Sequence, residues 1–246
     1  MTTIAHHLRL VRDRMHAACL ASGRDPASVR LLAVSKTFGA DAVAEAVAAG
    51  QTAFGENYIA EGVDKIKALR HWQAGAAEGS GAPASALKWH CIGPVQSNKT
   101  RLVAEYFDWV QSVDRLKIAQ RLSEQRPAEL PPLQVCLQVN IDGGANKSGV
   151  APDAALALAR EVAQLPRLVL RGLMAIPEPA IDFVAARAVH ASAKALFDHI
   201  NASGVLAVPM DTLSLGMTAD LEAAIHAGST MVRVGSAIFG GRPKSA

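Results

Sequence analysis

The feature that most constrains the fold is the regular alternation of short apolar segments with helical segments along the whole chain. Eight apolar segments have the length and composition of buried parallel strands, and amphipathic helices separate them. This alternation over 246 residues is typical of a (β/α)8 barrel. A doubly wound sheet is the alternative, but no GxGxxG motif follows the first strand. The predicted strands are 30–36, 52–57, 88–92, 108–113, 133–140, 169–176, 212–216 and 231–236.

We therefore predict an α/β protein with one domain over residues 1–246, a single TIM barrel with an extra N-terminal helix. That helix covers residues 3–21, where apolar side chains recur at helical spacing. A second predicted helix runs from Tyr58 to about Trp72. The low-complexity segment 74–85 follows it, and its alanine, glycine and serine residues predict a flexible surface loop.

The composition narrows the classes of partner and compartment. The net charge of +3 is too small for a dedicated nucleic-acid binder and suits a small anionic ligand. The three cysteines, Cys19, Cys91 and Cys136, form no CxxC pair, which favours a reducing compartment. We see no secretory signal and no apolar run of about 18 residues, so the expected location is the cytoplasm, away from membranes.

Lys36 ends the first predicted strand. The carboxyl ends of barrel strands are where ligands bind, and a lysine there can attack a carbonyl group when burial or cationic neighbours lower its pKa. By itself, this position is also consistent with a lysine that merely reaches water. His90 and Met174 also lie near strand ends, and we expect His90 to be a core histidine.

Two loops near the end of the chain predict a phosphate site. Ser214, Gly216, Met217 and Thr218 lead into a helix, and Gly235-Ser236 follows the last strand. Barrels often bind phosphate with the loops after strands seven and eight, where backbone N–H groups are free. Either loop alone is explained equally well by a helix cap or a tight turn.

Arg233 is the polar residue within the last strand. Val232 and Val234 have the opposite parity and should face the helices, so Arg233 should face the barrel interior. A buried guanidinium needs an acceptor, either a protein carboxylate or a ligand. A lysine, a phosphate site and an inward arginine together match the aldehyde, phosphate and ring nitrogen of pyridoxal 5′-phosphate (PLP). An arginine beside that nitrogen would leave it unprotonated and weaken the ring as an electron sink.

Motifs across nearly the whole chain resemble those of the pyridoxal phosphate homeostasis protein family. The matching stretches are Leu32 to Lys36, Phe54 to Tyr58, Trp89 to Lys99, Ser112 to Asp114, Val139 to Ile141, Lys147 to Gly149, Arg171 to Met174, Leu213 to Thr218 and Val232 to Gly240. The departures are the 74–85 segment, Cys91 in place of a larger apolar residue, and a small loop at 142–145.

The resemblance implies a barrel like the N-terminal domain of alanine racemase, with PLP held as a Schiff base (an internal aldimine) on Lys36. It places Arg233 at the ring nitrogen and Asn57 near the ring. It places Ser214, Gly216, Met217, Gly235 and Ser236 around the phosphate. With Met174, these residues form the predicted cofactor site, and we expect no metal site.

Two functions remain open for such a barrel. One is intracellular PLP homeostasis, in which a non-catalytic binder buffers or delivers the cofactor, with apo-PLP enzymes as candidate partners. The other is a PLP-dependent amino-acid racemase, which needs a proton donor on each face of the cofactor. Only Tyr58 and Tyr106 could supply the second donor. Tyr106 is expected in the middle of a helix, and Tyr58, near the barrel mouth, has no evident orienting partner, so we favour the binder. A Schiff-base aldolase would explain Lys36 and the phosphate site but not the resemblance.

Some predictions concern residues outside this set. We expect a monomer, because the second domain that completes such racemases is not recognisable here. Lys147 is a candidate second acceptor for the aldehyde, or a plain loop lysine. Lys99 and Arg101 are candidates for contacting a partner, or part of a solvated face.

Overall fold

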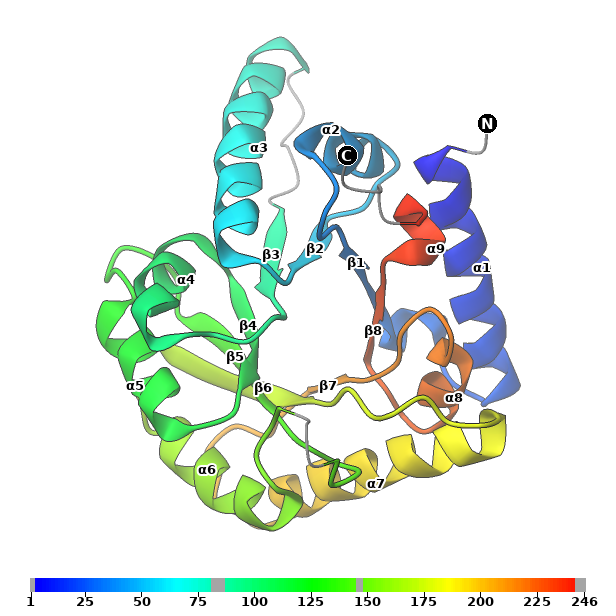
Figure 1. Ribbon diagram of the computed structural model, residues 1–246, viewed down its shortest axis with the longest axis vertical. Coiled ribbons are helices and arrows are strands. Elements are labelled where there is room, and N and C mark those ends of the chain that lie inside the picture. Colours follow the sequence, from blue (N-terminus) through cyan, green and yellow to red (C-terminus); the bar gives the residue numbers. More distant parts are fainter. Residues whose placement is uncertain (1–2, 81–86, 145–147, 242–246) are drawn as a thin grey trace.

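The sheet is a closed barrel of parallel strands, as the sequence predicts. The computed structural model describes residues 3–80, 87–144 and 148–241. Within these residues, strands β1 to β8 pair in chain order and β8 pairs with β1 (Figure 1). This closure excludes the doubly wound alternative. The strands are β1 Arg30–Val34, β2 Ala53–Glu56, β3 Lys88–Cys91, β4 Trp109–Val113, β5 Leu133–Gln138, β6 Leu168–Met174, β7 Thr212–Ser214 and β8 Met231–Val234.

Helices surround the barrel, and the extra helix α1 packs beside α8, α9 and α2 (Figure 1). Each main helix buries one apolar stripe against the outer face of the sheet, as amphipathic spacing requires. No helix in the described ranges is long and apolar enough to cross a membrane. The helices are α1 Ile4–Ala21, α2 Ala40–Ala48, α3 Ile59–Ser80, α4 Thr100–Tyr106, α5 Leu116–Gln125, α6 Ala155–Val162, α7 Phe183–Ala202, α8 Leu221–His226 and α9 Ser236–Phe239, with 3-10 turns η1 Pro26–Ser28, η2 Ser97–Lys99 and η3 Pro152–Ala154.

Helix α3 is longer than predicted. We predicted its end near Trp72 and a loop over 74–85, but the helix continues to Ser80 and projects beyond the barrel (Figure 1). The alanines at 74, 76 and 77 favour the helix, because alanine is the best helix former, whereas Gly75 and Gly79 oppose it. The loop prediction is therefore wrong for 74–80, and residues 81–86 lie outside the described residues.

The barrel interior contains a chain of buried polar groups. The guanidinium of Arg233 donates to the Ser214 hydroxyl at 2.8 Å, and this hydroxyl donates to Gln111 Oε1 at 2.7 Å. Gln111 Nε2 lies 2.9 Å from His90 Nδ1, and the His90 ring stacks on Trp109. His90 is thus a core residue, as expected. Each of these linked groups finds a partner, which avoids the cost of an unmade hydrogen bond.

The barrel wall requires a glycine at position 172. A Cβ atom on Gly172 of β6 would lie 1.5 Å from the carbonyl oxygen of Thr212 in β7. We predict that Gly172→Ala lowers the free energy of unfolding by about 3 kcal/mol, because the two strands must separate. Urea denaturation measures this loss. The control is Gly241→Ala, where an added methyl group meets nothing within 4 Å. Equal stability of the two variants would contradict the prediction.

Burial of His90 predicts a pH dependence of stability. Burial lowers the pKa of His90 from 6.5 to about 3, with Arg30 and Lys88 adding to the effect. Between these values the unfolded chain binds the proton and the folded chain does not. Stability should therefore fall below pH 6.5, by about 1.4 kcal/mol per pH unit for this group. His90→Asn should remove this slope, as measured by urea denaturation from pH 7 to about 4.5. A variant of the exposed His16, His16→Asn, should keep it.

Candidate functional site

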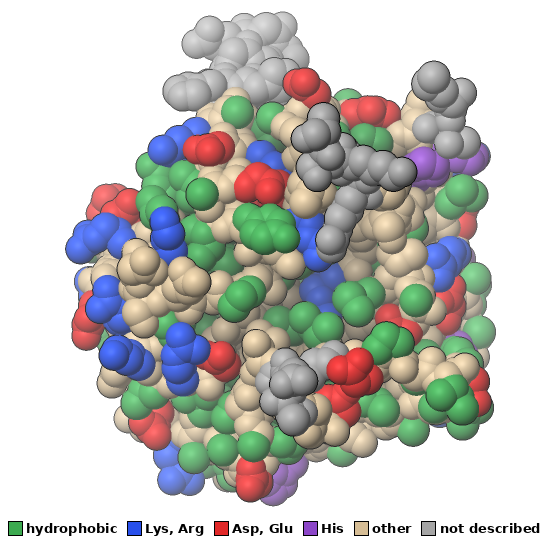
Figure 2. All heavy atoms as spheres, in the orientation of Figure 1, with side chains coloured by type: hydrophobic (Ala, Val, Ile, Leu, Met, Phe, Trp, Pro, Cys, Tyr) green, Lys and Arg blue, Asp and Glu red, His purple; other side chains and the backbone are tan. Residues whose placement is uncertain are grey.

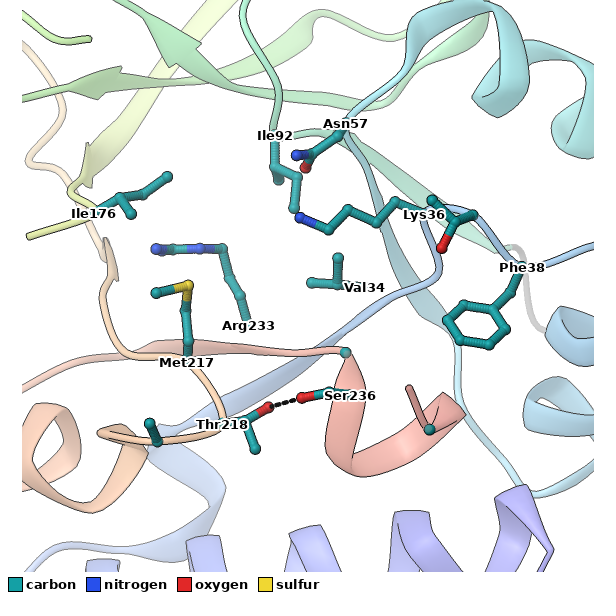
Figure 3. A pocket seen from close by; sticks show the side chains of 14 residues that line it. Val34, Lys36, Phe38, Asn57, Ile92, Ile176, Met217, Thr218, Arg233 and Ser236 are labelled. Atoms are coloured by element: carbon teal, nitrogen blue, oxygen red, sulfur yellow. Dashed lines mark hydrogen bonds between the residues drawn. The ribbon is translucent and has the colours of Figure 1, made fainter. Parts of the chain in front are cut away.

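A cavity of about 450 Å³ opens where the strands end, on the face seen in Figure 2. Six of the nine predicted site residues line it: Lys36, Asn57, Met217, Arg233, Gly235 and Ser236. Figure 3 shows Lys36, from the turn after β1, and Arg233, from β8, reaching into the cavity, with Asn57 and Ile92 beside the end of the Lys36 side chain. The other lining residues are Val34, Thr37, Phe38, Ile92, Ile176, Thr218, Ala219 and Gly240.

Lys36 lies in a turn, because β1 ends two residues earlier than predicted, at Val34. The next residue, Thr37, has a φ of 69°, in the left-handed region that a β-branched residue rarely adopts. The Phe38 N–H donates back to the Ser35 carbonyl at 3.1 Å and closes the turn. The chain therefore leaves the barrel wall at Ser35, and the Lys36 side chain enters the cavity.

Three charged side chains from β2 and α3, none of which lines the cavity, stabilise this turn through hydrogen bonds. Lys65 Nζ donates to the Ser35 carbonyl at 2.7 Å, to Glu56 Oε1 at 2.8 Å and to Glu61 Oε1 at 2.6 Å. Glu56 Oε1 also accepts the Ser35 hydroxyl at 2.5 Å, and Glu61 Oε1 accepts the Thr37 N–H at 2.7 Å. Burial raises the pKa of Glu56, and the Lys65 ammonium opposes this rise.

Glu56, Glu61 and Lys65 are not among the site residues predicted from the sequence. The available signals are a glutamate at the end of an apolar strand and a glutamate–lysine pair at i,i+4 spacing in the following helix. An i,i+4 pair is ordinarily read as a solvated surface pair. Only the packing of α3 against β2 reveals that Lys65 is buried.

Arg233 is buried with its charge directed into the barrel mouth. Its Nη1 donates to the Ser214 carbonyl at 2.7 Å, and its Nη2 donates to the Ala175 carbonyl at 2.9 Å. We expected a carboxylate or a ligand as acceptor, but these acceptors are backbone carbonyls. Burial lowers the pKa of Arg233 to about 10, although Asp220 counteracts it, so the group is cationic at neutral pH.

The two loops predicted to bind phosphate meet at one side of the cavity. Ser236 Oγ and Thr218 Oγ1 are 3.3 Å apart, and Figure 3 shows this contact between the start of α9, which follows β8, and the loop after β7. The alternative explanation of the loop after β7, a helix cap at Thr218, is wrong, because Asp220 holds the N-cap position of α8. The Thr218 hydroxyl thus faces the other loop, and Thr218 is a lining residue missing from the predicted site.

The loop after β7 is held from beneath by Asp220. Its Oδ1 accepts the Met217 N–H at 2.7 Å, and its Oδ2 lies 2.9 Å from His190 Nε2. Burial raises the pKa of Asp220, but the hydrogen bonds from His190 and from the Met217 N–H outweigh burial and lower it overall. Asp220 is therefore an ionised anchor for this loop at neutral pH.

Three predicted site residues are not on the cavity lining. Ser214 is buried and supports Arg233. Gly216 shapes the loop: its φ is 86°, and an added Cβ would lie 2.5 Å from the Ala224 side chain. Met174 is buried with Trp109 and Cys136, below the lining residue Ile176. The alternation of strand residues between two faces and the early ends of β6 and β7 explain these positions.

The remaining predicted residues lie elsewhere. Lys147 falls outside the described residues. Lys99 and Arg101 are exposed near the start of α4, where Figure 2 shows several cationic side chains over α4 and α5. Within the described ranges, no group of three His, Cys, Asp or Glu residues is arranged to hold a metal ion.

Comparison with known proteins identifies the family. The family model described as "Alanine racemase, N-terminal domain" matches residues 2–243. A "Pyridoxal phosphate homeostasis protein" of Pseudomonas aeruginosa is 55% identical over 98% of this chain and 97% of its own length. A protein of the same name from Escherichia coli K12 is 53% identical over 100% of this chain and 99% of its own length.

Solved structures agree with the sequence relatives. PipY of Synechococcus elongatus, in a structure described as having PLP bound, is 33% identical with a TM-score of 0.80, over 97% of this chain and 100% of its own. A Bifidobacterium adolescentis protein has a TM-score of 0.87 at 35% identity, over 96% of this chain and 94% of its own. Alanine racemase of Corynebacterium glutamicum is 14% identical with a TM-score of 0.65, over 94% of this chain and 61% of its own, and shares the fold alone. The chain therefore belongs to the pyridoxal phosphate homeostasis protein family, within the alanine racemase N-terminal domain family.

Proposed function

We propose that this protein binds PLP in the cavity at the barrel mouth and serves to store or deliver it inside the cell. The observation that carries the proposal is the convergence of Lys36, Arg233 and the Thr218–Ser236 hydroxyl pair on one cavity. The cavity volume of about 450 Å³ lies within the range of small-molecule sites. The related PipY protein, whose structure holds PLP, supports the same assignment.

The lining residues fit the groups of PLP. Lys36 would hold the aldehyde as a Schiff base, since a neutral amine and an aldehyde condense with loss of one water. Arg233 would face the ring nitrogen and, being cationic, would not protonate it. Asn57 and Ile92 would lie along the ring. The loops carrying Met217, Gly235 and Ser236 would receive the phosphate with backbone N–H groups and hydroxyls.

Ser214, Gly216 and Met174 would act on the cofactor indirectly. Ser214 orients Arg233 through two hydrogen bonds, one to its hydroxyl and one to its carbonyl. Gly216 permits the positive φ of the phosphate-side loop, and Met174 fills the floor of the site. These roles replace the direct contacts that the resemblance implies for Ser214 and Gly216.

The lining favours a binder over a racemase. Racemisation needs a second proton donor opposite the lysine. Among the described residues, no tyrosine lines the cavity. Tyr58 is 53% exposed, and Tyr106 packs against Lys67 and Arg70 on the outer surface. Lys36 would thus serve to retain the cofactor.

We also propose that the protein acts as a monomer in the cytoplasm, with apo-PLP enzymes as recipients. Cys19, Cys91 and Cys136 are unpaired and buried, as suits a reducing compartment. Mixing the PLP-loaded protein with an apo-enzyme and measuring recovery of that enzyme's activity tests the delivery step.

The central prediction concerns Lys36. Protein incubated with PLP and reduced with borohydride should carry the cofactor covalently on the peptide that contains Lys36, as read by mass spectrometry. Lys36→Ala should remove this label, because among the residues that the structure describes no other lining residue carries a primary amine. The matched control is Lys99→Ala, an exposed lysine outside the cavity. A label of unchanged amount on Lys36→Ala would refute the assignment.

A second prediction separates the binder from the racemase. Incubation of the PLP-loaded protein with D- or L-alanine in deuterated water should give no steady incorporation of deuterium at the α-carbon, because the second face lacks a tyrosine donor. Proton magnetic resonance measures the exchange. Sustained exchange that Lys36→Ala abolishes would favour the racemase.

A further inference from the structure

The side chains of Lys65, Glu56 and Glu61 form a cluster, the Lys65–Glu56–Glu61 cluster. This cluster forms hydrogen bonds with the residues on both sides of Lys36. On one side, Lys65 and Glu56 hold the carbonyl and hydroxyl of Ser35. On the other side, Glu61 holds the Thr37 N–H. No residue of the cluster lines the cavity itself. The cluster therefore acts on the backbone that carries Lys36.

The burial of these charges adds little to the stability of the fold. Glu56 is 0% exposed and Lys65 is 5% exposed, so both charges have lost most of their hydration. Desolvation of a buried pair commonly cancels its attraction, and an apolar pair of similar volume is often as stable. The charged side chains form directional hydrogen bonds with backbone atoms of Ser35 and Thr37, and an apolar pair could not form them. The geometry of the cluster thus favours an orienting role.

The conformation of Thr37 shows what needs to be oriented. Its φ of 69° is unfavourable for a β-branched side chain, so the free chain would not adopt it. The charged Glu61 carboxylate accepts the Thr37 N–H at 2.7 Å and so stabilises this conformation. A relaxed Thr37 would change the direction in which the chain leaves Lys36.

We infer that Glu61, Lys65 and Glu56 are positioning residues, which aim the Lys36 amine into the cavity and so govern how readily it bonds to an aldehyde ligand. This inference rests on the proposed function for its ligand. It does not require the cluster to touch that ligand. Its consequence is that loss of the cluster impairs capture of the aldehyde more than it impairs binding of the ring and phosphate.

Glu61 is the best position for the test, because its side chain is 32% exposed and its loss leaves the Lys65–Glu56 pair intact. Glu61→Ala removes the acceptor for the Thr37 N–H, whereas Glu61→Gln keeps a carbonyl oxygen there. The control is Glu105→Ala, which removes a helical glutamate that lies 3.9 Å from Arg101.

The affinity of each variant is measured for two ligands. PLP carries the aldehyde, and pyridoxine 5′-phosphate carries an alcohol in its place, so only PLP can bond to Lys36. Glu61→Ala should weaken PLP binding about tenfold, the loss expected for one charge-assisted hydrogen bond. It should change the affinity for pyridoxine 5′-phosphate by less than about twofold. Glu61→Gln should recover most of the PLP affinity, and Glu105→Ala should match the wild type.

Equal weakening for both ligands would show general damage to the site and overturn the inference, as would wild-type affinities in Glu61→Ala. A measurement without ligand separates this inference from the proposed function. Hydrogen exchange of the backbone amides at 35–38 should be faster in Glu61→Ala than in Glu61→Gln, and equal rates would overturn the positioning role. If borohydride fails to label the wild-type protein with PLP, the proposed Schiff base is refuted. The hydrogen-exchange comparison would still decide whether Glu61 holds the turn at 35–38.

Lys65→Met provides an independent variant. It removes the donor to Ser35 and leaves Glu56 without its cation, so the same selective loss of PLP affinity is expected if the protein folds. Circular dichroism and thermal unfolding establish folding before the titration. Selective loss supports the inference, and equal weakening for both ligands contradicts it. If Lys65→Met does not fold, the comparison of Glu61→Ala with Glu61→Gln decides between these outcomes.

Discussion

Closure of the sheet between β1 and β8 is the constraint on which the rest of the structure depends. Leu32 pairs with Arg233 and Ala33 pairs with Val234 across this seam. The seam brings the turn that carries Lys36 next to the loop that carries Ser236, although these segments come from opposite ends of the chain (Figures 1 and 3). Without closure, the cavity would lack one of its walls.

The second constraint is a charge inside the barrel. Arg233 needs acceptors where water is absent, and the carbonyls of Ser214 and Ala175 supply them at the ends of β7 and β6. From Ser214 the polar chain continues through Gln111 to His90. The acceptors of the arginine thus lie at the ends of two strands and not on a flexible surface side chain. This rigidity suits the role at the ring nitrogen that we propose for Arg233.

The lysine is supported differently. Arg233 is held through its own guanidinium, whereas Lys36 is held through the backbone on either side of it, by Lys65, Glu56 and Glu61. Its side chain enters the cavity (Figure 3). A rigid backbone with a side chain directed into the cavity suits the Schiff-base role that we propose for Lys36.

The sequence by itself determined the barrel, the extra N-terminal helix and the inward direction of Arg233. Each of these follows from a local period: alternating strands and helices, a helical stripe in 3–21, and the two faces of a strand. Lys36 and the two loops near the end of the chain were found in the same way, because barrel ligands bind at the strand ends.

Only the tertiary structure decided which of those residues reach the cavity. It separated Met217 and Ser236, on the lining, from Ser214 and Met174, beneath it, and it added Thr218. It extended α3 through a segment that resembled a loop. It also revealed the cluster behind Lys36, whose members look like surface charges in the sequence. The reason is that the burial and the hydrogen-bond partners of these side chains depend on how α3 packs against β2. The hydrophobic periodicity of the sequence contains no information about that contact.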